Sequence, residues 1–256
     1  MTIVNLRIAV FLVFLGILTP GIASGKDKVE SANKAEQKSP IKPIFYPLPP
    51  EEPRIQFLKS FSSSDDFEKP AGAFRRFIVG SEKKTRPIIK PYGVTVHDKK
   101  IYICDTVRNG IDILDFKTRE FRYFNSNDAV QLIDPIHLDF DASGNMYVAD
   151  SRRGQVVIFD KDEKYAGAIG KNSEFKPTDL LIKDDKIFIC DLKTHSVRVY
   201  GLKDKEYLMS IPSDGVKPEG KLFSPANMVT DEVGNLYVSD IGAFKVQKYN
   251  ARGEYL

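Results

Sequence analysis

Three polar residues share one position of an internal repeat and could together hold a cation or a polar ligand. His137, Asp179 and Asn227 each lie two residues after a proline, and Gly93 holds that position in an earlier copy. Imidazole nitrogens and carboxylate and amide oxygens are common ligands of divalent metals. A site that collected these side chains would therefore suit metal-assisted chemistry or recognition of a polar ligand. The alternative is that they only solvate a water-filled channel.

The repeat that carries these residues occurs four times. Each copy has an apolar residue three positions after its proline, then an aromatic residue, and an aspartate three positions after the aromatic. A β-branched residue follows six positions later and opens a further strand. The prolines are Pro91, Pro135, Pro177 and Pro225, and the aspartates are Asp105, Asp150, Asp191 and Asp240. Four short strands in a repeat of about 40 to 50 residues predict a propeller blade, so we expect the four residues above to line one level of a central channel.

The closest matches to a known motif lie in the first and last copies. Pro91-Tyr92-Gly93-Val94-Thr95-Val96 and Gly234-Asn235-Leu236-Tyr237-Val238-Ser239-Asp240 resemble the NHL repeat, and the resemblance covers Pro91 to Leu256. The leader from Tyr46 to Leu58 is similar to the start of secreted bacterial six-bladed NHL proteins, many of them lipoproteins. This resemblance implies an all-β fold, a β-propeller of four-stranded antiparallel blades within a six-bladed ring. WD40 and kelch propellers fit poorly, because the chain has no Trp and no paired glycines.

The chain divides into three expected parts. Residues 1–25 have Arg7, an apolar core and small residues after it, which predicts an export signal. Residues 26–53 are first charged and then rich in proline, which predicts an extended tether. Residues 54–256 form the predicted propeller, with blades at 91–125, 135–170, 177–211 and 225–256. The export signal implies a periplasmic or extracellular protein. No lipoprotein cysteine follows the signal, so we expect a soluble mature protein unless the segment stays uncleaved, with no membrane span after cleavage.

Two segments precede the blades. Residues 54–61 are strand-like and belong to no repeat, so we expect them to complete the last blade and close the ring. Residues 70–79 have helical spacing, and we expect a short helix that lies on the propeller; plugging the channel is the alternative. Six blades need about two more than are present, so the sequence is either partial or a four-bladed ring. Its end inside a predicted strand favours the partial interpretation.

Charge and cysteine content exclude some functions. The chain has 38 Lys and Arg against 35 Asp and Glu, and without Arg7 the balance is 37 to 35. Such a near-neutral, exported protein is a poor candidate for binding nucleic acid. Cys104 and Cys190 occupy the same repeat position in non-adjacent blades, too far apart for a disulfide, so both should be buried free thiols.

The remaining chemistry-bearing residues gather around the repeat aspartates. Each aspartate ends a buried strand, and we expect it to accept hydrogen bonds from backbone N–H groups rather than to act as a catalytic acid or metal ligand. The turns that follow carry basic residues that would cluster on one rim and could bind a partner. These are Arg108, Arg152, Arg153, Lys193, His195 and Lys245.

The sequence contains no motif for serine hydrolases, phosphate loops or zinc peptidases. It therefore favours an exported binding or scaffold module for a protein, peptide or glycan of the cell envelope, without catalysis and without a cofactor. The alternative is a metal-dependent lyase or lactonase-like enzyme that holds a divalent metal in the channel.

Overall fold

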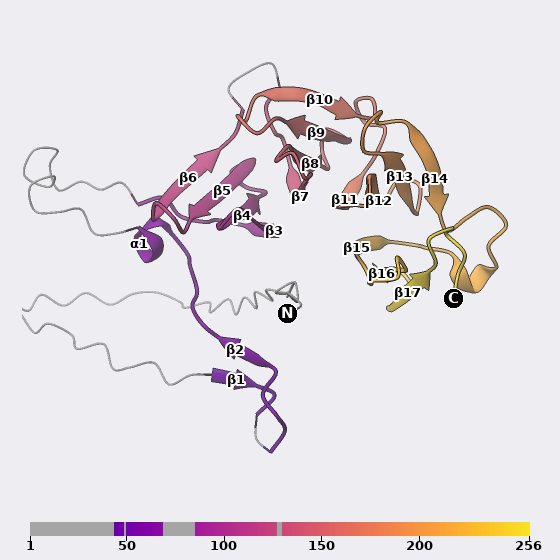
Figure 1. Ribbon diagram of the computed structural model, residues 1–256, viewed down its shortest axis with the longest axis horizontal. Coiled ribbons are helices and arrows are strands. Elements are labelled where there is room, and N and C mark those ends of the chain that lie inside the picture. The colour runs from indigo at the N-terminus through magenta and orange to yellow at the C-terminus, as the bar shows by residue number, and fades with distance from the viewer. Residues whose placement is uncertain (1–43, 49, 69–84, 127–129) are drawn as a thin grey trace, which may run out of the picture. The chain divides into compact units, whose positions relative to one another are not determined.

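The computed structural model describes residues 44–48, 50–68, 85–126 and 130–256, and shows an all-β propeller with four antiparallel blades (Figure 1). The predicted export signal and the predicted helix at 70–79 lie outside these residues, as does most of the predicted tether. Among the described residues, no helix is long and apolar enough to cross a bilayer.

The blades are meanders in which neighbouring strands pair in sequence order. Blade 1 contains β3 (Pro91–His97), β4 (Lys100–Asp105), β5 (Gly110–Asp115) and β6 (Glu120–Phe124). Blade 2 contains β7 (Pro135–Phe140), β8 (Met146–Asp150), β9 (Gln155–Phe159) and β10 (Tyr165–Ile169). Blade 3 contains β11 (Pro177–Lys183), β12 (Lys186–Asp191), β13 (Ser196–Gly201) and β14 (Tyr207–Ile211). Blade 4 has β15 (Pro225–Thr230), β16 (Leu236–Asp240) and β17 (Lys245–Tyr249), and an isolated bridge joins Tyr255 to Tyr249.

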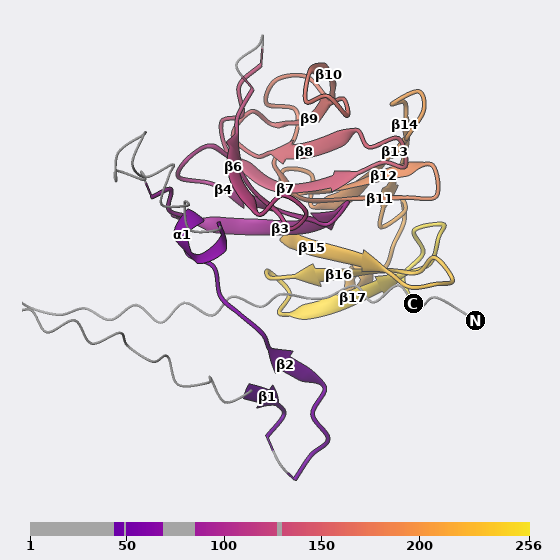
Figure 2. The ribbon, with the colours of Figure 1, turned by 60° about the vertical axis from the view of Figure 1, so that its left-hand side comes forward.

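The innermost strands β3, β7, β11 and β15 gather at the centre, and β6, β10 and β14 lie on the outside (Figures 1 and 2). The strand β3 contacts β7, β7 contacts β11, and β11 contacts β15. Three apolar clusters join successive blades. The β-branched residue that opens the third strand of the repeat lies in these clusters. Ile111, Val156 and Val197 are 0% exposed because the following blade covers them. In blade 4 the equivalent Val246 is 65% exposed.

The first blade is covered on its other face by a short segment. The helix α1 (Ser64–Phe67) places the Phe67 ring, 0% exposed, against Leu114 and Phe121. A capping box at Ser63 and Asp66 satisfies the first turn of this helix. The segment thus buries apolar surface that no blade covers.

Two turn types explain why the copies differ by one residue in length. The short turn Asp98-Lys99 has positive φ at both residues, as a two-residue type I′ hairpin requires. The longer turn of blade 2 places Gly144 at φ +83° while the Asp141 carboxylate accepts bonds from the N–H groups of Ser143 and Asn145.

Residues 44–60 belong to a separate compact unit. In it β1 (Ile44–Tyr46) pairs with β2 (Ile55–Phe57), so part of the predicted closing strand forms a hairpin with residues expected to be tether. Closure of the ring by residues 54–61 stays a prediction.

Both cysteines are free and buried, as predicted. Burial raises the pKa of each thiol above its ordinary value, which makes both thiols unreactive at neutral pH.

Candidate functional site

The four residues of the predicted channel set lie on the four innermost strands. Gly93 is on β3, His137 on β7, Asp179 on β11 and Asn227 on β15. Their equivalent register positions follow from the repeat, and successive strands are in contact. Two of them, His137 and Asp179, come within ion-pair distance, whereas Gly93 has no side chain to offer and the Asn227 side chain lies outside that pair.

The pair bridges blades 2 and 3. Nδ1 of His137 lies 2.8 Å from Oδ1 of Asp179, and 3.1 Å from the Leu180 carbonyl oxygen. The second carboxylate oxygen of Asp179 accepts a bond from the Met228 N–H at 2.8 Å, which extends the contact to blade 4. Burial disfavours the imidazolium, but the carboxylates of Asp179 and Asp139 and the Leu180 carbonyl together outweigh burial, so the pKa of His137 is raised. His137 keeps 23% of its side chain exposed.

Gly93 makes room for this imidazole. A Cβ at Gly93 would overlap the Ile136 carbonyl oxygen and lie 2.8 Å from Cδ2 of His137. The glycine in blade 1 and the histidine in blade 2 are thus a matched pair. Asn227 is exposed, and its backbone N–H donates to the Ser239 hydroxyl oxygen at 3.0 Å.

In the part of the chain that the structure describes, no three His, Cys, Asp or Glu side chains gather as a metal site would require. The predicted channel metal and polar ligand therefore stay proposals, supported by the two-residue pair alone.

The repeat aspartates are structural acceptors, as predicted. Asp150 is 0% exposed and accepts bonds from the N–H groups of Ile133, Asp134 and Arg153 at 2.7, 3.0 and 3.0 Å. The carboxylate ties the turn after β8 to the residues that lead into β7. The other repeat aspartates bond in the same way to the turns and leading segments of their own blades.

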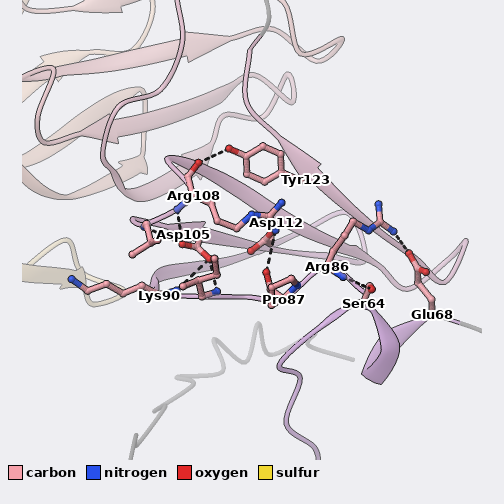
Figure 3. A network of polar contacts seen from close by, with 11 residues as sticks. Ser64, Glu68, Arg86, Pro87, Lys90, Asp105, Arg108, Asp112 and Tyr123 are labelled. Carbon is pink, nitrogen blue, oxygen red and sulfur yellow. Dashed lines mark hydrogen bonds and ion pairs between the residues drawn. The ribbon is translucent and has the colours of Figure 1, made fainter. Parts of the chain in front are cut away.

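The strands that end on these aspartates all end on the same side of the propeller, which we call the aspartate side. The basic turn residues lie there, but most of them bond within the protein. Arg108 donates to the Pro87 carbonyl at 3.1 Å and to Asp112 at 2.9 Å, and its guanidinium lies over the Tyr123 ring (Figure 3). Burial raises the pKa of Asp112 to about 7, although Arg108 opposes this.

The other cations repeat this pattern. Each donates to a carbonyl of the segment that leads into its own blade: Arg153 to Gln131, Lys193 to Ser173 and Lys245 to Glu219. Nδ1 of His195 hydrogen-bonds to the carbonyl of Phe223, in the segment that leads into blade 4. Arg152 is exposed. The prediction that these residues bind a partner is untested, but their internal bonds give most of them a structural task.

A pocket of 490 Å³ opens between blades 3 and 4 on the aspartate side. Its lining comes from the turn after β12, the end of β14 and the segment between β14 and β15: Thr194, His195, Ser196, Ser210, Pro212, Ser213, Asp214, Gly215, Val216, Lys221 and Leu222. Of these residues, only His195 was predicted from the sequence to bind a partner. The sequence does indicate where this pocket lies, because the segment between β14 and β15, which supplies much of the lining, is longer than the segment between β10 and β11.

No protein-family model matches the chain, and a search of curated proteins gives no match. Solved structures show the fold. An inactive histidine-to-alanine variant of Staphylococcus aureus virginiamycin B lyase, bound to quinupristin, has a TM-score of 0.53 at 13% identity over 65% of this chain and 54% of the lyase chain. A nidogen/laminin complex gives 0.54 at 16% identity over 68% and 66%. Hydrazine synthase of Kuenenia stuttgartiensis gives 0.51 at 13% identity over 69% and 51%.

The chain spans about half the length of the lyase. At these identities the likeness shows the propeller fold alone, so the resemblance to the NHL repeat stays a prediction.

Proposed function

We propose that this protein is an exported binding or scaffold propeller that presents its aspartate side to a protein, peptide or glycan partner of the cell envelope. The observation that carries the proposal is the pocket between blades 3 and 4, which opens beside exposed turn residues. Phe244 in the adjoining blade 4 turn is 93% exposed at φ +52°, where the other blades have Asn109, Gly154 and His195. An exposed aromatic in an unfavourable backbone conformation supports a contact role.

Sedimentation of the purified protein with cell-envelope fractions tests this proposal. The double variant Arg152→Glu/Phe244→Asn alters two exposed residues of the aspartate side, and Asn tolerates the positive φ of position 244. We expect this variant to lose co-sedimentation. The control Lys161→Glu/Val233→Asn likewise reverses one charge and replaces one exposed apolar residue with Asn, at turns on the opposite side. Equal binding by the two variants would contradict the proposal, as would no binding by the unaltered protein.

We also propose that the four blades are part of a six-bladed ring. The exposure of Val246, against 0% at its three equivalents, supports an interface that another blade covers. The resemblance of these repeats to those of six-bladed NHL proteins supports the same interpretation.

A channel enzyme is the second candidate, favoured by the His137–Asp179 pair. An imidazole beside a carboxylate is an arrangement that general bases use, and this one is partly open to solvent. Elemental analysis of the purified protein separates the candidates, because a stoichiometric divalent ion lost in a His137→Ala/Asp179→Ala variant would favour the metal-dependent lyase or lactonase-like function.

A further inference from the structure

The pocket between blades 3 and 4 contains a chain of oriented hydroxyl groups. The hydroxyl of Thr194 donates to Oδ2 of the buried Asp191 at 2.8 Å, and the Ser196 hydroxyl lies 2.8 Å from that of Thr194. A hydroxyl has one hydrogen, so Thr194 uses its own on Asp191 and Ser196 donates to Thr194. Ser196, 8% exposed, keeps its acceptor lone pairs for a ligand in the pocket.

A second hydroxyl of the lining belongs to Ser210 in β14. Its oxygen lies 2.8 Å from the phenol oxygen of Tyr207, a residue that does not line the pocket. Pro212, Val216 and Leu222 add apolar surface to the lining. Hydroxyl groups next to apolar carbon match the alternating polar and apolar faces of a pyranose ring.

The charges of the lining point to a neutral ligand. Asp214 and Lys221 offset each other, and the imidazole of His195 bonds to the Phe223 carbonyl. The hydroxyl pair is also specific to this blade. The positions of Thr194 and Ser196 hold Arg108 and Gly110 in blade 1, Arg153 and Gln155 in blade 2, and Ala243 and Lys245 in blade 4.

We infer that this pocket binds one neutral pyranose unit of an envelope glycan, an inference that rests on the proposed binding function. A volume of 490 Å³ falls in the range of small-molecule sites and accommodates a single sugar ring with its nearest substituent. Ser196 and Ser210 fix the ring through its hydroxyls, and the apolar lining packs against its carbon face.

Chemical-shift mapping of the isotope-labelled full chain tests this inference with three probes: methyl α-D-glucopyranoside, methyl α-D-mannopyranoside and methyl N-acetyl-β-D-glucosaminide. We expect at least one to bind with a Kd on the order of millimolar, as few contacts allow, and to shift resonances of residues 194–196 and 210–222. Ser196→Ala should weaken that binding roughly two- to tenfold, the value of one neutral hydrogen bond. Ser143→Ala, in an exposed turn on the opposite side, is the matched control and should leave binding unchanged.

Three results would overturn the inference: no shift with any of the glycosides, shifts outside the pocket only, or unchanged affinity in Ser196→Ala with an unchanged melting temperature. Tighter binding of the blocked peptide acetyl-trialanine amide in the same pocket would assign it to peptides instead. Envelope binding that persists when all glycosides fail would sink the sugar inference and leave the proposed function standing. Loss of envelope binding as well would sink both.

Discussion

Nδ1 of His137 lies 2.8 Å from Oδ1 of Asp179, and this contact joins the innermost strands of blades 2 and 3. The same carboxylate accepts the Met228 N–H of blade 4. One aspartate therefore connects three successive blades at a level where each inner strand meets the next, and its partner is a titratable group.

The stability of the propeller should depend on the protonation of His137. The raised pKa means that the folded state binds the proton more tightly than the unfolded chain does. This stabilisation is fully present below the unfolded pKa of about 6.5 and is lost as pH rises through the higher folded pKa. Melting temperatures across this window should fall with pH, and Asp179→Asn should flatten that fall. An NMR titration of His137 that gives a pKa below 6.5 would refute the assignment.

The repeat aspartates should be costly to remove. Asp150→Ala leaves three N–H groups of Ile133, Asp134 and Arg153 without their acceptor in a buried site. We expect a loss of about 3 kcal/mol or more in the free energy of unfolding, measured by urea denaturation. Asp162→Ala, at an exposed turn of the same blade, is the control and should change stability by less than about 0.5 kcal/mol. Similar losses in the two variants would argue against the acceptor role.

Sequence patterns predicted the repeat unit, its strands and the aspartate acceptors, because these depend on local spacing. They did not predict that Arg153, Lys193 and Lys245 donate to carbonyls of the leading segments, since those carbonyls become neighbours only when the blade folds. The pairing of Ile44–Tyr46 with Ile55–Phe57 was missed for a similar reason. The prolines around these short strands suggested an extended chain, and a three-residue strand has too little alternation to reveal its partner.

The exposed face of blade 4 should govern self-association. Val246 is 65% exposed where Ile111, Val156 and Val197 are buried, so Val246→Ala should cost little stability while Val156→Ala costs about 2 kcal/mol. We expect the 256-residue chain to associate through this face, and Val246→Asp to lower the mass measured by analytical ultracentrifugation. If the unaltered chain stays monomeric at all concentrations, the exposed face of blade 4 does not drive self-association.

Two free thiols should be counted in the unfolded protein. Cys104 and Cys190 are buried and unbridged, and burial raises the pKa of both. A colorimetric thiol reagent should react slowly with the folded protein, and with both cysteines after denaturation without reductant. A count of zero would mean that the two are bridged in solution.

Gly93 should tolerate no side chain, because the His137 ring of the next blade occupies the space beside it. A Cβ there would overlap the Ile136 carbonyl oxygen and approach Cδ2 of His137 to 2.8 Å and its Cα to 2.9 Å. Two of these atoms are backbone, so the contact is relieved only if β3 and β7 move apart. We expect Gly93→Ala to lower the free energy of unfolding by about 1 to 3 kcal/mol and to weaken the pH dependence that the His137–Asp179 pair confers. Gly144→Asn is the control, since position 144 has a positive φ that Asn tolerates and its nearest neighbour is 3.7 Å from a Cβ. If Gly93→Ala melts like the unaltered protein and keeps its pH profile, β3 and β7 can accommodate a Cβ at this position, and the glycine is not required to position His137.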